Sequence, residues 1–291
     1  MRTRAFLRKL AAPALLLAVH CLAVRAQTTE AEIKARLIGK PLYLRGFWVD
    51  DRLKFDADGQ PTSNFRTGTF TETGIDVHKV KLSDGVLHLK GQRVGLEFSP
   101  NGLRSSTTVP RRVALSGKDY SGFIDIEIQA PPDGDFSKAL DSIFAPDLAS
   151  LVPGMPFYWQ YYARKHFLDP APASAPKPNT VAGKEPGVGT SDKPVPVGGS
   201  VKKPVVLEQV EPQFSDAARA LNFSGMVTVY LWVRSDGRID HLSIVKPAGL
   251  GLDEQALVAV SKYKFKPSTK DGAPVTVDLY VDVNFQIGNG P

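Results

Sequence analysis

The sequence has almost no cysteine. Its one cysteine, Cys21, lies near the N-terminus, in a segment that we expect to be removed from the mature protein. A mature chain without a thiol excludes disulfide bonds, thiolate zinc sites, iron–sulfur clusters and cysteine nucleophiles. Any catalysis would therefore have to come from other side chains.

Those side chains form no recognisable catalytic or metal-binding pattern. The four histidines after the leader are not spaced as two ligands on one strand or helix, and no phosphate-binding glycine-rich loop is present. Ser261-Lys262-Tyr263-Lys264 matches a hydrolase motif by chance, because its companion motifs are absent. Asp56-Ala57-Asp58-Gly59 indicates a hairpin turn rather than a calcium loop. We expect no enzymatic activity, no cofactor and no metal.

The mature chain also lacks an excess of charge. The whole sequence has 36 Lys and Arg against 30 Asp and Glu, a formal charge of +6. Five of the basic residues fall within residues 1–26, which contain no acidic residue, so the remainder is almost neutral. Nucleic-acid binding requires a clustered cationic surface, and none is indicated.

Residues 1–26 are typical of a cleavable signal peptide. Basic residues precede an apolar run from Leu10 to Val24, and Val24-Arg25-Ala26 places small residues at the two positions that signal peptidase reads. The run is shorter than the roughly 20 residues that cross a bilayer. An uncleaved membrane anchor is the alternative interpretation.

A proline-rich spacer divides the mature chain. Residues 169–204 contain eight prolines, five glycines and no aromatic residue, a composition typical of a flexible, partly polyproline linker. We therefore expect an N-terminal domain over residues 27–168 and a C-terminal domain over residues 205–291.

The N-terminal domain is predicted to be mainly β, with helices at its end. Asp84-Gly85 predicts a hairpin between strands 77–82 and 86–89, and further strands are expected at 94–98, before Asn101-Gly102, and at 123–128. A short helix is expected over 31–38, and helical spacing returns over 136–144, after Asp135 as N-cap, and over 157–167. This order indicates an α+β fold. Its function is not assigned by any motif.

The helix expected at 157–167 is rich in aromatic residues. Phe157, Tyr158, Trp159, Tyr161 and Tyr162 cannot all face inward from one helix, so part of the cluster should be exposed. Packing in a core or against another domain is favoured over a sugar or ligand platform.

The C-terminal domain has the clearest pattern. A short helix over 215–221, with Ser215 as N-cap, precedes a strand from Gly225 whose alternate residues are apolar. Asp236-Gly237 turns the chain into strand 239–246, a helix begins at Leu252 and is ended by Pro267, and an unbroken alternation runs from Val275 to Ile287. Two helices and three antiparallel strands are predicted.

These residues resemble the C-terminal domain of the TonB family. The resemblance covers residues 205–287 and rests on six short motifs that occur in the family's order. They are Pro212, Gly225-Met226-Val227, Asp236-Gly237-Arg238, the helix 252–260, Tyr263-Lys264-Phe265-Lys266-Pro267 and Asp271-Gly272-Ala273-Pro274-Val275.

The resemblance implies a periplasmic protein that binds TonB-dependent outer-membrane receptors, or other envelope proteins, by adding a peptide strand to its sheet edge. The alternative is a membrane-anchored energy transducer that couples a proton-driven inner-membrane motor to outer-membrane transporters. The last strand is the expected docking site, and it also permits a homodimer. Its expected partner-binding residues are Val275, Val277, Asp278, Leu279, Tyr280, Val281, Asp282 and Val283, and its expected exposed side chains are Thr276, Asp278, Tyr280, Asp282, Asn284 and Gln286.

We predict that the mature protein begins at or near Gln27, because the apolar run is short and is followed by the Val24-Arg25-Ala26 site. Mass spectrometry of the N-terminal peptide from the fractionated cell envelope checks this. Recovery of an intact peptide beginning at Met1 in the inner-membrane fraction would instead support the anchored transducer.

Overall fold

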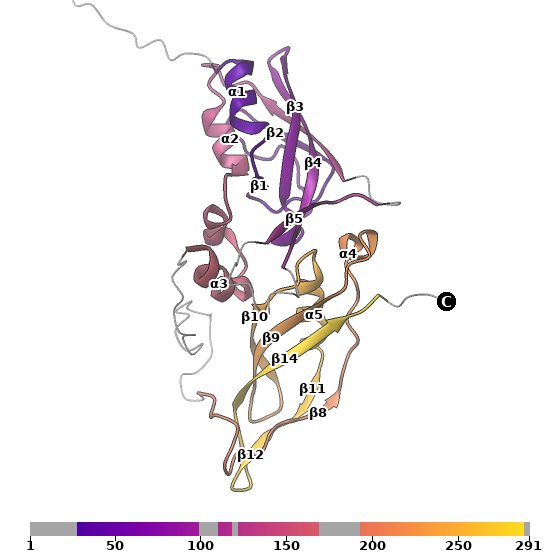
Figure 1. Ribbon diagram of the computed structural model, residues 1–291. Helices are drawn as coiled ribbons and strands as arrows, with labels where there is room; N and C mark the ends of the chain where they lie inside the picture. The colour runs from indigo at the N-terminus through magenta and orange to yellow at the C-terminus, as the bar shows by residue number, and fades with distance from the viewer. Residues whose placement is uncertain (1–27, 99–109, 118–121, 169–192, 288–291) are drawn as a thin grey trace, which may run out of the picture.

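A computed structural model describes residues 28–98, 110–117, 122–168 and 193–287. The leader and Asn101-Gly102 therefore lie outside the described residues. Figure 1 shows an N-terminal unit, built around one large sheet, stacked end to end with a C-terminal unit built around a smaller one.

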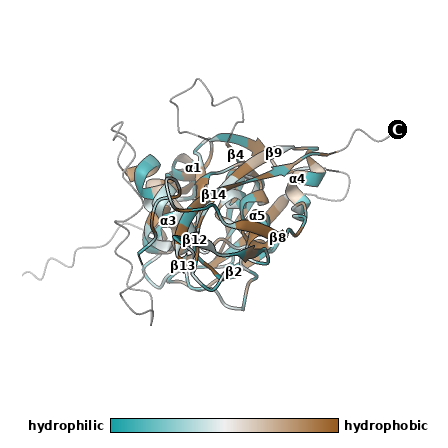
Figure 2. Ribbon diagram, turned by 90° about the horizontal axis from the view of Figure 1, so that it is seen from below, coloured by the Kyte–Doolittle hydropathy of each residue, from teal (hydrophilic) through white to brown (hydrophobic). Residues whose placement is uncertain are grey.

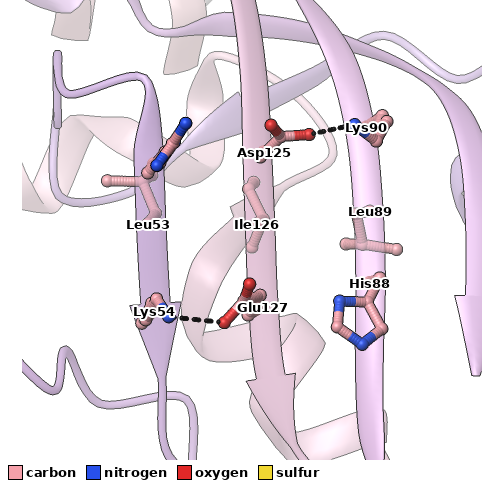
Figure 3. Close-up of a pocket in the computed structure, with 9 residues that line it drawn as sticks. Leu53, Lys54, His88, Leu89, Lys90, Asp125, Ile126 and Glu127 are labelled. Atoms are coloured by element: carbon pink, nitrogen blue, oxygen red, sulfur yellow. Dashed lines mark ion pairs between the residues drawn. The ribbon is translucent and has the colours of Figure 1, made fainter. Parts of the chain in front are cut away.

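The N-terminal sheet has the strand order β2-β6-β4-β3-β1-β7, with β5 paired to β4. Its strands are β1 (Leu42–Leu44), β2 (Arg52–Phe55), β3 (Gly74–Ser83), β4 (Val86–Glu97), β5 (Arg111–Ala114), β6 (Phe123–Gln129) and β7 (Phe144–Ala145). The pairs are antiparallel except β2 with β6, which is parallel. On the solvent face, cross-strand ion pairs join Lys54 to Glu127 at 2.9 Å and Lys90 to Asp125 at 3.1 Å (Figure 3).

The predicted hairpin around Asp84-Gly85 is present. Both turn residues have positive φ, 54° and 74°, as a two-residue turn between twisted strands requires. The expected strands 86–89 and 94–98 are one continuous strand, β4. Its length matters because its far end, which is paired with β5, extends beyond β3 and β6 and reaches the C-terminal unit.

Helices cover the apolar face of this sheet (Figure 1). α1 (Glu30–Leu37) starts with a capping box between Thr29 and Glu32 and buries Ile33. α2 (Ser137–Ile143) begins where the Asp135 carboxylate accepts the backbone N–H of Ser137 at 3.0 Å. The remaining helical segments are the 3-10 turns η1 (Phe70–Glu72) and η3 (Ala149–Gly154), then α3 (Phe157–Ala163) and the π turn η4 (Arg164–Leu168).

The C-terminal unit contains a three-stranded antiparallel sheet of order β10-β9-β14. β9 (Gly225–Val233) is central, between β10 (Ile239–Lys246) and β14 (Val277–Phe285), and α5 (Leu252–Val260) packs across the sheet after the short α4 (Asp216–Ala220). Two small ladders flank the sheet: β8 (Val205–Glu208) with β11 (Lys264–Lys266), and β12 (Ser268–Lys270) with β13 (Ala273–Val275). In Figure 2, β8 appears as an apolar strand, and its three aliphatic side chains are 46 to 66% exposed.

Three expectations for this region were wrong. The unbroken strand 275–287 is interrupted at Thr276, so that Val275 belongs to β13 rather than β14. α5 ends at Val260, well before Pro267, because the chain turns and forms β11 first. The spacer does not extend to residue 204, since Val195 forms a bridge with Val277 and the Val201 side chain is 9% exposed.

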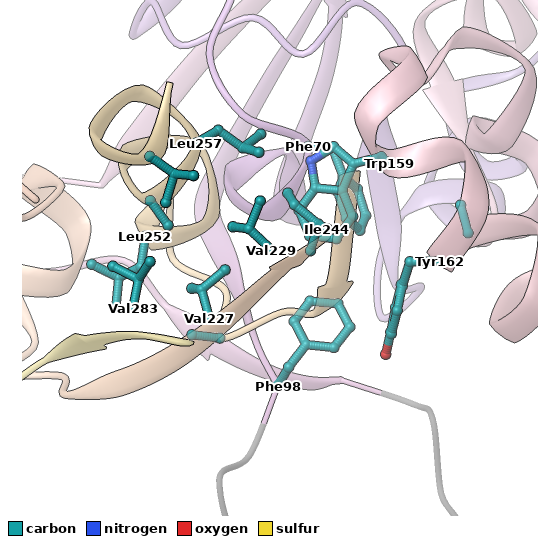
Figure 4. Packing of buried hydrophobic residues seen from close by; sticks show 14 of the residues in the cluster. Phe70, Phe98, Trp159, Tyr162, Val227, Val229, Ile244, Leu252, Leu257 and Val283 are labelled. Atoms are coloured by element: carbon teal, nitrogen blue, oxygen red, sulfur yellow. The ribbon is translucent and has the colours of Figure 1, made fainter. Parts of the chain in front are cut away.

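The two units share one apolar core. Trp159 of α3 is fully buried and packs edge-on against Phe70, with ring centroids 4.8 Å apart, and Tyr162 packs against Phe98 at 5.6 Å. Figure 4 shows these rings beside Ile244 and close to α5 of the C-terminal unit. The expectation that the aromatic cluster packs in a core or domain contact is therefore correct, and Phe157 supplies its exposed part, at 62%.

Backbone hydrogen bonds also join the units. The Phe98 N–H donates to the Ala248 carbonyl at 2.9 Å, and the Leu250 N–H donates to the Leu96 carbonyl at 3.0 Å. Between them Gly249 has φ of 93°, and a Cβ there would lie 2.0 Å from the Leu96 carbonyl oxygen. Glycine thus permits the close approach of the two backbones. We refer to the pairing of Leu96–Phe98 with Ala248–Leu250 as the junction.

We predict that Gly249→Ala lowers the free energy of unfolding much more than Gly272→Ala. Both glycines have positive φ, 93° and 85°, but nothing lies within 4 Å of a Cβ at Gly272. Gly272→Ala, the control, should therefore lower the free energy of unfolding by about 1 kcal/mol through backbone strain. Gly249→Ala should lower it by about 2 to 4 kcal/mol, because the clash adds to the strain. Urea denaturation measures both, and equal losses would show that the junction does not depend on this contact.

Candidate partner-binding edge

β14 is an edge strand. Along its full length it pairs with β9, in an unbroken register from Val277 opposite Val233 to Phe285 opposite Gly225. On its other side, within the described part of the chain, the pairing is confined to the start of the strand, where Val195 forms a parallel bridge with Val277. Most of this edge is therefore open.

Two hydrogen bonds fix which backbone groups face the open edge. The Thr276 carbonyl accepts the N–H of Val195 at 2.9 Å, so it points outward. The N–H of Ile287 donates to the Ser224 hydroxyl, next to β9, so it points inward. Backbone groups alternate along a strand. It follows that the outward N–H and C=O groups belong to Asp278, Tyr280, Asp282 and Asn284.

The predicted site residues divide between the two faces of β14. Val277 and Val283 are buried in the core, and Leu279 and Val281 pack partly against it. Asp278, Tyr280 and Asp282 lie on the opposite face, where Tyr280 is 57% exposed. Thr276 is not exposed as expected but buried, because it stands at the break between β13 and β14. Val275, in β13, pairs with Ser268 and is not part of the edge.

The face that carries the two carboxylates has a polar and aromatic network that the sequence patterns did not indicate. The Thr228 hydroxyl donates to Asp282 at 2.6 Å, the Tyr230 hydroxyl donates to Asp278 at 3.2 Å, and the Trp232 indole N–H donates to Tyr230 at 2.7 Å. Burial, followed by the charge of Asp278, raises the pKa of Tyr230, so its hydroxyl keeps its proton at neutral pH. The signal for this network was the aromatic character of the second face of β9.

Aromatic stacking extends this face in both directions. The Trp232 and His241 rings stack with centroids 3.9 Å apart and 15° between their planes, and the Tyr230 and Tyr280 rings are 5.4 Å apart. The face next to the open edge is therefore firm and amphipathic, with Tyr280 as its exposed member. An edge strand with unpaired backbone groups can accept a further strand from another chain.

A depression of about 260 Å³ lies on the solvent face of the N-terminal sheet, over β2, β6 and β4 (Figure 3). The ion pairs Lys54–Glu127 and Lys90–Asp125 lie along it. Four of the charged side chains that line the depression are therefore paired with one another, and Arg52 is a further charged residue of its lining. Within the described ranges, no group of three or more metal-ligating side chains is present.

Comparisons with known proteins identify the family of a segment within the C-terminal unit. A family model described as the Gram-negative bacterial TonB protein C-terminal matches residues 210–287. Protein TonB of Vibrio cholerae serotype O1 is 29% identical over 89 residues, which are 30% of this chain and 36% of that protein. Protein TonB of Escherichia coli strain K12 is 30% identical over 91 residues, which are 31% of this chain and 37% of that protein. Residues 210–287 are a TonB family C-terminal segment.

These matches span just over a third of the length of the curated relatives, and the N-terminal unit lies outside them. The solution NMR structure of the Pseudomonas aeruginosa TonB CTD is 24% identical and covers 32% of this chain and 93% of its own, with a TM-score of 0.26. Among the helices of the described residues, none is long and apolar enough to cross a membrane.

Proposed function

We propose that this chain is a periplasmic TonB-like protein whose C-terminal domain binds outer-membrane receptors, or other envelope proteins, by strand addition at β14. The family of residues 210–287 supports a role in TonB-dependent transport across the envelope. The observation that carries the proposed binding mode is the open edge of β14, with the backbone groups of Asp278, Tyr280, Asp282 and Asn284 directed outward.

The domain organisation forms part of the proposal. A signal peptide over residues 1–26 would export the protein, and the N-terminal unit would be carried with the TonB-like domain rather than apart from it, because the two share a core. The anchored energy transducer is the alternative. It is favoured by the apolar run from Leu10 to Val24, which would serve as the anchor if it is retained.

The chemistry of the edge indicates the kind of segment that it would accept. Asp278 and Asp282 flank Tyr280, and each already accepts a hydrogen bond from a hydroxyl of β9, which holds it in place without neutralising its charge. Two fixed carboxylates beside an open edge favour a partner segment with Lys or Arg and disfavour an acidic one. The same carboxylates would also hinder pairing between two copies of β14, because they repel across the resulting interface.

We predict that Tyr280→Pro weakens the binding of an extended peptide of about eight residues by roughly tenfold or more. Proline removes one outward N–H and its ring obstructs the edge, and a single backbone hydrogen bond contributes about 0.5 to 1.5 kcal/mol. Tyr280→Ala is the matched control, since it loses the side chain and keeps the N–H. Isothermal titration with a lysine-bearing peptide measures both, after circular dichroism has shown that the variants are folded.

Equal binding by folded Tyr280→Pro and wild-type protein would show that this edge is not the docking site. Equal losses in Tyr280→Pro and Tyr280→Ala would assign the effect to the aromatic ring and not to strand pairing.

We further predict that the double change Asp278→Asn and Asp282→Asn lowers the preference for a lysine-bearing peptide over its glutamate-bearing counterpart. Asparagine can still accept the hydroxyl hydrogen bonds but carries no charge, so the wild-type preference, about tenfold at low salt, should fall to near unity. Titrations at low and high ionic strength check this. If the double variant keeps the preference for the lysine-bearing peptide, the carboxylates do not select the partner and serve only to prevent pairing between two copies of β14.

A further inference from the structure

Three carboxylic acids lie near the contact between the two units. Glu72 ends η1 of the N-terminal unit, and Asp253 and Glu254 lie in the first turn of α5 in the C-terminal unit. A Cβ added to Gly251, which immediately precedes α5, would stand 2.5 Å from Glu72 Oε1. The Glu72 carboxyl group is thus in contact with the start of the helix that carries the other two acids.

Hydrogen bonding distinguishes these acids. Asp253 is fully buried and accepts the backbone N–H groups of Ala248 at 2.8 Å and Gly249 at 2.9 Å, next to the junction. Glu254 Oε1 accepts the indole N–H of Trp159 at 2.8 Å. Its second oxygen, Oε2, is buried and has no hydrogen-bond partner among the described residues. An ionised Glu254 would therefore hold charge on an oxygen that neither water nor the protein solvates.

Few groups nearby can compensate such a charge. On the N-terminal side the cation that acts on Glu72 is Arg93 of β4, and its guanidinium already donates to the carbonyls of Trp48 and Asp50. Asp216, at the start of α4, adds a further negative charge toward Glu72. The titratable groups of α3 near these acids are Tyr158 and Tyr162. Burial, followed by the charge of Glu254, raises the pKa of Tyr158, and burial, followed by the charge of Asp253, raises the pKa of Tyr162. Acidic groups outnumber the cation at this contact.

The pKa values follow from this placement. Burial raises the pKa of Glu72 to about 7, against an opposing effect of Arg93. Burial first, and then the charges of Asp253 and Glu72, raise the pKa of Glu254, although the indole hydrogen bond opposes this. Burial also raises the pKa of Asp253, opposed by its two amide hydrogen bonds.

We propose that pH controls the contact between the two units. The contact is closed when Glu72 and Glu254, which lie on opposite sides of the interface, are protonated, and it loosens as they ionise. This inference rests on the interface alone and does not depend on the proposed strand addition at β14, which is on the opposite edge of the C-terminal sheet from α3.

The direction of the effect follows from proton linkage. When the units separate, water reaches both glutamates and their pKa values return toward the ordinary value of 4.5. The docked form therefore binds more protons than the separated form. Docking is most favourable below about pH 4.5 and becomes less favourable as pH rises. For Glu72 the decrease runs up to about pH 7. Each group changes the opening equilibrium by about tenfold per pH unit within its window.

Hydrogen exchange of the full mature protein tests the proposal. The reporters are the junction amides of Phe98 and Leu250, whose hydrogen bonds cross between the units, and the internal reference is Val229 in the central strand β9. After correction for the intrinsic exchange rate, we expect the opening constant at the junction to rise at least tenfold per pH unit between pH 5 and 7. The reference amide should not follow it.

Glu72→Gln and Glu254→Gln, combined, should remove this pH dependence, since glutamine is close in size and does not ionise in this range. Glu254→Gln also keeps an oxygen for the Trp159 indole. Glu211→Gln, at an exposed glutamate of the C-terminal unit, is the control and should retain the full slope.

A flat opening constant in the wild-type protein would overturn the proposal, as would an undiminished slope in the folded double variant or a junction and reference that open together. If the double variant does not fold, Glu72→Gln is tested alone. The proposal requires that the rise of the junction opening constant per pH unit be about tenfold smaller in Glu72→Gln than in the wild type. An unchanged rise would refute it.

Discussion

The close approach of two backbones at Gly249 determines the arrangement of the rest of the molecule. Because no side chain stands between them, the end of β4 can pair with Ala248–Leu250 and insert Phe98 beneath the C-terminal sheet. Trp159 and Phe70 then complete a core to which both units contribute. This arrangement also packs α3 against β10, and burial of large aromatic side chains is worth several kcal/mol.

The same contact makes the two edges of the C-terminal sheet unequal. α3 packs beside β10, so that edge is covered by the N-terminal unit (Figure 1). β14, at the other side, has Val195 at its start and is otherwise open among the described residues. The N-terminal unit therefore covers one edge of the C-terminal sheet and leaves most of the other edge, β14, open among the described residues.

Local patterns predicted the features that depend on local interactions. Asp84-Gly85 predicted its hairpin because the turn needs two residues with positive φ, and the apolar spacing of α5 predicted its helix because that face is buried on the adjoining sheet. The TonB resemblance located the domain, and the family model agrees over residues 210–287. Alternation along β14 correctly divided its core residues from Asp278, Tyr280 and Asp282.

Features set by contacts between distant residues were not predictable in this way. The break at Thr276 depends on pairing of β13 with β12, and the burial of Trp159 depends on residues about 90 positions away in either direction along the chain. Hydrogen bonds from Thr228 and Tyr230 to the two aspartates join strands separated by about 50 residues. The alternate residues Thr228, Tyr230 and Trp232 on the second face of β9 were the one sequence signal of that network, since aromatic residues are uncommon on a fully exposed face, and Thr228 and Tyr230 are indeed buried.

The two units that touch are parts of one chain, in which 24 residues stand between Leu168 and Lys193. Covalent connection over such a length makes the contact intramolecular, with an effective concentration of the order of millimolar. An interface too weak to hold two separate proteins together at cellular concentrations would still be mostly formed within this chain. A molecule that competes with the N-terminal unit for the surface of α5 and β10 must overcome that local concentration. A ligand that binds at β14 does not compete with the N-terminal unit.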